Sequence, residues 1–206
     1  LWHTSGESLT STAELHPEKA TLQGLGSAIT YLRRYQLLVS SKMPKSIADS
    51  MRNMERQGNP WGIPPENRMA WAEGLNVREL AAGDQVDVLY FVGCAAAFDQ
   101  RNKKVARAFV KLLQKAGVDF GVLGFDEMCC GETARRMGHE YMFQEFAKQN
   151  IETFSKIKFN RIVTACPHCF NTLKNEYPQM GGDYKVMHYT ELLVELKLSV
   201  PGSNAN

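Results

Sequence analysis

The chain has 206 residues, of which 44% are hydrophobic, enough for one ordinary core with an appendage. Lys and Arg number 24 and Asp and Glu 22, so the formal net charge of +2 provides no field to attract nucleic acid or an anionic membrane. The longest apolar stretch, residues 86–98, contains Asp87 and is shorter than the roughly 20 residues that cross a bilayer. Since the first residues also lack the basic start and apolar core of a signal peptide, we expect a cytoplasmic protein.

The first part of the sequence predicts helical segments and a linker. Apolar residues at helical spacing predict a helix over residues 19–39, and a polar amphipathic segment follows over residues 42–53. Residues 57–65 contain three prolines and two glycines, which predicts an irregular loop. We expect Trp61 and Trp71 to clamp this linker on the core domain. The expected parts are an appendage (1–39), a helical and linker segment (40–83), a core domain (84–198) and a tail (199–206).

Extended and helical patterns alternate through the core domain. Strands are expected over residues 86–92, 118–123, 161–165 and 185–188, and helices over residues 102–116, 132–156, 167–176 and 190–196. This alternation favours a parallel sheet with right-handed crossovers and helices on its faces. The predicted fold class is therefore α/β, a small parallel sheet with flanking helices, preceded by a helical N-terminal appendage.

All five cysteines follow predicted strands. Cys94 follows the first strand, Cys129 and Cys130 follow the second, and Cys166 and Cys169 follow the third. Because the carboxyl ends of parallel strands meet at one crevice, we expect the five thiols to converge there. An odd number of cysteines in a cytoplasmic chain argues against a disulfide framework. Five thiolates would repel one another, so an ionised group of them needs a polycation, supplied by iron or zinc.

Four interpretations of the cysteines differ in their chemistry: inert buried thiols, a thioredoxin-like dithiol in Cys166-Pro167-His168-Cys169, a zinc site using four of the five, and an iron–sulfur site. Adjacent cysteines together with a C-x-x-C turn at strand ends are poor choices for a core and good choices for ligands, which favours iron–sulfur. Small residues at Gly93 and 95–97 keep the first loop compact, and Gly131 lets the backbone approach closely. A helix starting near Glu132 would direct free N–H groups at the sulfurs.

The pattern of Cys94, Cys129-Cys130-Gly131 and Cys166-Pro167-His168-Cys169 resembles the CCG cysteine-rich domain. Members of that family include the B-type subunits of heterodisulfide reductase and many bacterial iron–sulfur oxidoreductases. Residues 53–62 and 166–177 also resemble the large iron–sulfur oxidoreductases that accept electrons from acyl-CoA dehydrogenase and electron-transfer-flavoprotein systems. The similarity covers about residues 43–198.

The resemblance implies a noncubane [4Fe–4S] cluster held by all five cysteines, Cys94, Cys129, Cys130, Cys166 and Cys169. The implied function is an electron-transfer module of a heterodisulfide reductase-like oxidoreductase, with disulfide reduction if a second module is present. A flavoprotein and a second CCG or ferredoxin-like module are the implied redox partners, in a membrane-associated complex through other subunits. The family's modules occur in tandem, whereas this sequence has one. Some family modules hold zinc, so a zinc-binding structural or interaction module without catalysis is the alternative.

The N-terminal residues resemble a different family. Residues 21–35, with Gly6-Glu7-Ser8 upstream, are similar to a fragment of the phage ERF single-strand annealing proteins. Tyr31, Arg33, Arg34 and Tyr35 combine charge with stacking surfaces, as single-strand binders do. A solvated helix face is favoured over this interpretation because about 38 residues build little core. Binding of single-stranded DNA through this N-terminal segment remains as the second alternative function.

Overall fold

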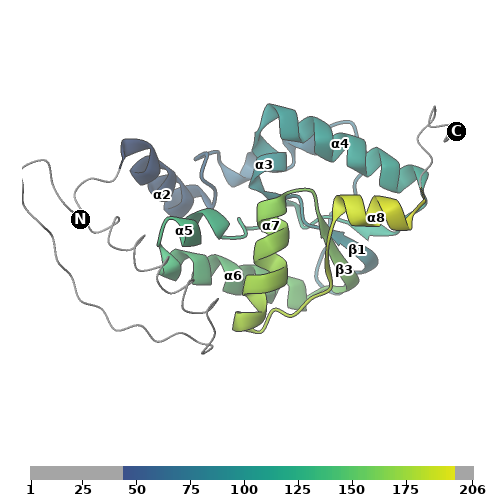
Figure 1. Cartoon of the computed structure of the whole chain (residues 1–206). Helices are drawn as coiled ribbons and strands as arrows, with labels where there is room; N and C mark the ends of the chain where they lie inside the picture. Colours follow the sequence, from purple (N-terminus) through teal and green to yellow (C-terminus); the bar gives the residue numbers. More distant parts are fainter. Residues whose placement is uncertain (1–43, 198–206) are drawn as a thin grey trace, which may run out of the picture.

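The computed structural model describes residues 44–197. Its helices and strands follow one another in the order α2 (Lys45–Gln57), η1 (Pro65–Asn67), η2 (Ala70–Ala72), β1 (Gln85–Tyr90), α3 (Gly93–Phe98), α4 (Gln100–Lys115), β2 (Phe120–Gly121), η3 (Gly124–Asp126), α5 (Glu132–Arg136), α6 (Glu140–Ser155), β3 (Lys158–Thr164), α7 (Pro167–Asn171), η4 (Thr172–Glu176), η5 (Tyr177–Met180), β4 (Val186–His188) and α8 (Tyr189–Glu195) (Figure 1). The predicted appendage of residues 1–39, its ERF-like segment and the tail of residues 199–206 lie outside the described residues.

The four strands form one parallel sheet in the order β2-β1-β3-β4. Leu89 of β1 is in register with Gly121 of β2 on one side and with Ile162 of β3 on the other, so β1 lies inside the sheet. Val88, Leu89 and Tyr90 are all fully buried, as expected for a strand whose two faces are both covered. The predicted α/β fold with a small parallel sheet is confirmed.

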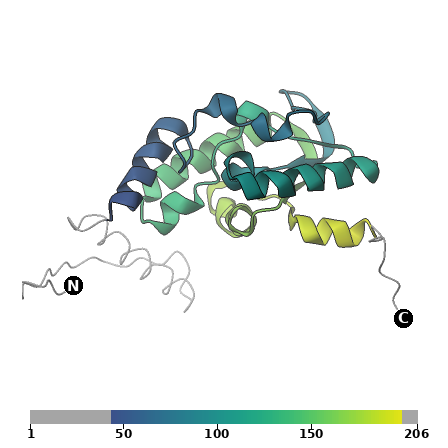
Figure 2. The ribbon, with the colours of Figure 1, turned by 90° about the horizontal axis from the view of Figure 1, so that it is seen from above.

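Helices cover both faces of this sheet. Phe109 of α4 contacts Tyr90 at the end of β1 and Tyr189 of α8, with ring centroids 5.1 and 5.6 Å apart. Phe154 of α6 contacts Phe91, the residue after Tyr90, at 6.1 Å. Since consecutive residues of an extended segment point to opposite faces, α4 and α8 share one face and α6 lies on the other. Helices α2 and α8 lie at opposite ends of the molecule (Figures 1 and 2).

Three predicted elements are corrected by the structure. Residues 93–98, expected as a compact loop, form the helix α3. The long helix expected over residues 132–156 is wrong: it divides into α5 and α6 because Gly138, at φ +88°, reverses the chain and His139 caps the next helix by accepting from Met142 N. The strand expected over residues 118–123 is reduced to the two residues of β2.

The segment between α2 and β1 packs against the core domain. Trp71 is buried and meets Tyr90 edge-on at 6.2 Å, whereas Trp61 is 45% exposed and lies 6.3 Å from Phe98. Arg107 of α4 donates hydrogen bonds to the carbonyls of Trp71 and Glu73, both at 2.7 Å. Trp71 thus holds this segment on the core as expected, whereas the more exposed Trp61 contributes only its contact with Phe98.

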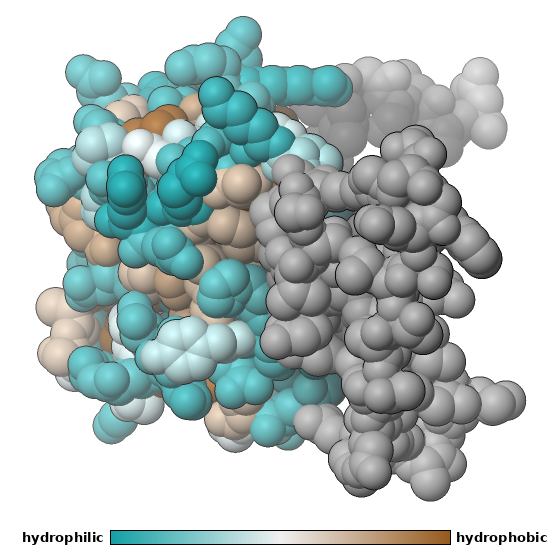
Figure 3. Space-filling model, turned by 90° about the vertical axis from the view of Figure 1, so that its left-hand side faces the viewer, coloured by the Kyte–Doolittle hydropathy of each residue, from teal (hydrophilic) through white to brown (hydrophobic). Residues whose placement is uncertain are grey.

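The face drawn in Figure 3 is mainly polar over its described part, with smaller apolar areas between the hydrophilic side chains. Among residues 44–197, no helix combines the length and the apolar character needed to cross a bilayer.

Candidate functional site

The five cysteines lie at the carboxyl ends of the strands. Cys94 is the second residue of α3, directly after β1. Cys129 and Cys130 precede α5, Cys166 caps the N-terminus of α7 after β3, and Cys169 lies within α7. Cys166 is partly exposed, the other four are buried, and none forms a disulfide.

The five thiols are neighbours that shift one another's pKa values in one continuous row. The pKa of Cys94 is affected by Cys129, that of Cys129 by Cys130, that of Cys130 by Cys169, and that of Cys166 by Cys169. A Cβ on Gly93, the residue before Cys94, would lie 3.0 Å from Cys169 Sγ, so the ends of β1 and β3 also meet at the thiols. Residues from three separate strand ends therefore meet, as the sequence predicts. Within residues 44–197, however, no three His, Cys, Asp or Glu side chains are grouped as ligands of a single metal ion.

Two thiols in the row have lowered pKa values. The pKa of Cys130 is lowered because its sulfur accepts hydrogen bonds from the thiols of Cys129 and Cys169 and from the backbone N–H of Glu132. The pKa of Cys166 is lowered to about 6, first by the Cys169 thiol and then by backbone N–H groups at the start of α7. Negative charge on sulfur is thus stabilised at two positions of the row, one buried and one at its exposed end.

A buried ion pair between Arg68 and Glu127 holds the turn before Cys94. The carboxylate of Glu127 accepts hydrogen bonds from the backbone N–H groups of Val92 and Gly93, both at 2.8 Å, and pairs with the guanidinium of Arg68. Arg68 Nη1 lies 3.9 Å from Cys94 Sγ. Neither residue is predicted from the sequence, in which the position of Glu127 two residues before the cysteine pair is the only signal for either.

The charge of Arg68 acts on the first thiol of the row. The pKa of Cys94 is raised by its contact with Cys129 and by burial. The positive charge of Arg68 lowers the pKa of Cys94, and this effect is larger than the increase in the same pKa caused by the negative charge of Glu127. The pKa of Cys169 is also raised, first by Cys130. The pKa values of Cys94, Cys129 and Cys169 are thus raised and only those of Cys130 and Cys166 are lowered, so ionising all five thiols requires further positive charge in the site.

The backbone of the cysteine pair is held by buried polar side chains. Asn150 of α6 accepts a hydrogen bond from Met128 N at 3.1 Å and donates one to the carbonyl of Cys129 at 3.2 Å. The hydroxyl of Tyr177 donates to the carbonyl of Cys130 at 3.2 Å. Neither residue was predicted, although a buried amide on the apolar side of a helix is a detectable signal.

Buried donors around the thiols have no acceptor among the described residues. Arg68 Nε and the Tyr90 hydroxyl are both enclosed and unpaired there. Tyr90 is the last residue of β1, at the strand end that leads to Cys94, and its pKa is raised first by burial and then by Glu127 and Cys169. An unpaired buried donor costs about 1–3 kcal/mol, so a bound group rich in acceptor atoms would relieve this cost. The thiols and the unpaired donors together fit an iron–sulfur cluster, whose sulfides are acceptors.

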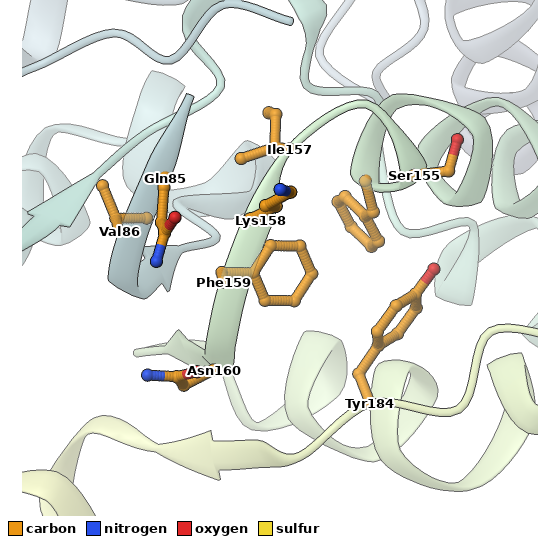
Figure 4. A pocket seen from close by; sticks show the side chains of 9 residues that line it. Gln85, Val86, Ser155, Ile157, Lys158, Phe159, Asn160 and Tyr184 are labelled. Atoms are coloured by element: carbon orange, nitrogen blue, oxygen red, sulfur yellow. The ribbon is translucent and has the colours of Figure 1, made fainter. Parts of the chain in front are cut away.

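A pocket of about 500 Å³ lies away from the thiols. It is lined by Gln85 and Lys158, the first residues of β1 and β3, and by aromatic side chains that include Phe159 and Tyr184 (Figure 4). It therefore belongs to the amino ends of the strands, the edge of the sheet opposite to the cysteines, and has no part in the thiol site.

Comparison with known proteins agrees with this geometry. Residues 88–174 match the CCG cysteine-rich domain, and this part of the chain belongs to that family. The predicted resemblance is thereby confirmed. The matched segment begins within β1, extends past α7 and includes all five cysteines.

The curated relatives are iron–sulfur oxidoreductases. The chain is 44% identical over 173 residues to the EtfAB:quinone oxidoreductase of Syntrophomonas wolfei, covering 82% of this chain and 24% of that protein. It is 43% identical to the probable iron-sulfur-binding oxidoreductase FadF of Bacillus subtilis, covering 80% and 24%. With the D-type subunit of dihydromethanophenazine:CoB–CoM heterodisulfide reductase from Methanosarcina acetivorans the identity is 32%, covering 67% and 34%. The chain thus spans between a quarter and about a third of these relatives. No solved structure matches it.

Proposed function

We propose that this chain is an electron-transfer module of an iron–sulfur oxidoreductase. In this proposal Cys94, Cys129, Cys130, Cys166 and Cys169 hold one iron–sulfur cluster of the noncubane [4Fe–4S] type. The observation that carries the proposal is the meeting of five neighbouring thiols, four of them buried, from three strand ends. Soft thiolate ligands are the ligands that such clusters take.

The side chains around the thiols would tune and protect the bound group. An iron–sulfur cluster supplies one-electron transfer when it is bound. The N–H of Glu132 and the N–H groups at the start of α7 donate to sulfur and stabilise its negative charge. Four thiols are buried, which excludes water, and Cys166 is partly exposed. The Cys166 edge therefore gives electrons the shortest route between the site and a partner.

The relatives' names support redox partners of two kinds. A flavoprotein of the EtfAB type and a second CCG or ferredoxin-like module are the proposed redox partners; one relative is named as an EtfAB:quinone oxidoreductase and another as a probable membrane-anchored ferredoxin. Both would belong to the longer protein or complex of which this module forms a part, with any membrane association made through other subunits.

Anaerobic reconstitution with iron and sulfide tests the proposal. The purified chain should bind both and develop the broad visible absorption of sulfide-to-iron charge transfer. A colourless chain that binds zinc and no iron would instead establish the zinc-binding alternative and refute the proposed function.

Ligand substitutions test the assignment of the cysteine pair. Cys129→Ser and Cys130→Ser should each prevent normal assembly, because a hydroxyl is a harder and far less acidic ligand than a thiol. Met128→Leu, a volume-conserving change beside the pair, is the control and should retain the cluster. Full iron and sulfide content in either serine variant would refute that cysteine as a ligand.

A further inference from the structure

Arg68 reaches the thiol site from outside the matched family segment. It follows η1, twenty residues before the segment 88–174 begins, yet its side chain is only 5% exposed. The helical and linker segment thus supplies a charged residue to a site otherwise built by the core domain.

The geometry directs the guanidinium at the first cysteine. One terminal nitrogen pairs with Glu127 and the other lies 3.9 Å from Cys94 Sγ. Glu127 is bonded in turn to the N–H groups of Val92 and Gly93, so the pair and the turn before Cys94 form one hydrogen-bonded unit. Moving Arg68 would therefore also move the turn that carries Cys94.

A second observation concerns the remaining nitrogen of the same side chain. Arg68 Nε is buried and has no hydrogen-bond acceptor within residues 44–197. Buried donors are paired in the great majority of cases, so an unpaired one beside five thiols calls for an acceptor in the site. A sulfide or thiolate sulfur has that chemistry.

We propose that Arg68 is a positioning residue for Cys94 and that its positive charge raises the reduction potential of the bound cluster. This inference rests on the proposed function. Reduction adds an electron to a site of five thiolates, and a nearby cation stabilises that added charge more strongly in a buried environment than in water. Arginine suits the role because its guanidinium stays charged and offers donors in several directions.

The test needs variants that remove the charge of Arg68 and still fold. Arg68→Met alone would leave Glu127 buried and unpaired, which destabilises strongly. Arg68→Gln removes the positive charge but keeps N–H donors for the Glu127 carboxylate, and the double variant Arg68→Met/Glu127→Gln removes both charges. Arg68→Lys retains the charge. Arg107→Met is the matched control, since Arg107 also holds the linker segment through the carbonyls of Trp71 and Glu73.

Each 206-residue chain is reconstituted, its iron and sulfide are quantified, and its midpoint potential is measured by redox titration. Arg68→Gln should be at least tenfold harder to reduce, which is 59 mV for a one-electron couple, and Arg68→Lys should retain most of the wild-type potential. The double variant should shift in the same direction by less, because it also loses the opposing charge of Glu127. Arg107→Met should lower stability without moving the potential.

The possible outcomes distinguish failure of this inference about Arg68 from failure of the proposed function. Wild-type protein that binds no iron overturns the proposed function before any variant is compared. Loaded wild-type protein with an unchanged potential in Arg68→Gln overturns the role of Arg68 alone. An equal shift in Arg107→Met would show that the effect comes from loosening of the linker segment, which also overturns it.

Discussion

Asn150 donates a hydrogen bond to the hydroxyl of Tyr177, with 3.0 Å between Nδ2 and Oη. Because the hydroxyl accepts this bond, its own proton is free to point at the carbonyl of Cys130, 3.2 Å away. Asn150 also bonds the backbone of Met128 and Cys129. Two fully buried side chains from different elements therefore fix the backbone of the cysteine pair.

Tyr177→Phe should destabilise the protein by about 1–3 kcal/mol, because it leaves the carbonyl of Cys130 without its partner in a buried site. The free energy of unfolding from urea titration measures this. Tyr184→Phe is the control, since Tyr184 is half-buried and its hydroxyl makes no hydrogen bond within the described residues. Equal stability of the Tyr177→Phe and wild-type proteins would mean that the hydroxyl contributes nothing.

Gly93→Ala should disturb the thiol site. Gly93 has φ +76°, and a Cβ there would lie 3.0 Å from Cys169 Sγ, so the side chain would strain the backbone and displace a sulfur. Gly74→Ala is the matched control, with φ +72° and nothing within 4 Å of the added Cβ. We expect both variants to lose about 1–2 kcal/mol from backbone strain and only Gly93→Ala to lose iron on reconstitution. Matching iron contents would show that the close approach to Cys169 is unimportant.

Tyr90→Phe should have opposite effects with and without the cluster. Without it, the buried hydroxyl has no partner among the described residues, so its removal should be neutral or stabilising. In the reconstituted protein the hydroxyl gains a sulfur acceptor, and the variant should then be less stable than wild type by about 1 kcal/mol. Thermal unfolding of both forms under anaerobic conditions measures the difference. The same effect in both forms would contradict a hydrogen bond from Tyr90 to the bound group.

Acid should weaken the link between β1 and β3. The pKa of Asp87 is lowered by hydrogen bonds from Asn160 and then from Arg161. A carboxyl with a lower pKa in the folded state stabilises the protein above its unfolded pKa, near 3.9, and this contribution is lost as the pH falls through the folded value. Since Asp87 is partly exposed, we expect at most about 1 kcal/mol.

Chemical denaturation at pH 7 and pH 3 tests this expectation. Asp87→Asn should lose stability at pH 7 and show a smaller decrease between the two pH values than wild type. Asp183→Asn is the control, because the Asp183 carboxylate makes no hydrogen bond within residues 44–197, and its pH dependence should follow wild type. An unchanged pH dependence in Asp87→Asn would refute the contribution of this carboxylate.

Local patterns determined the larger features of this protein. Apolar runs of strand length that alternate with amphipathic helices predicted the parallel sheet. This works because an element with a buried face carries its apolar residues at a fixed spacing along the chain. Cysteines placed directly after three strands predicted their convergence, since parallel strands end at one edge. The break at Gly138 was missed because an isolated glycine is compatible with a helix until the packing of the next one is known.

Only the tertiary structure decided which other side chains meet the thiols. Arg68 and Glu127 are far apart in the sequence and carry no motif, yet they pair beneath Cys94. Asn150 and Tyr177 come from two elements that meet only when α6 packs on the sheet. Such contacts depend on the relative placement of whole elements, which local periodicity does not encode. The sequence by itself thus determined where the sulfurs gather, and tertiary packing decided the charges and hydrogen bonds that surround them.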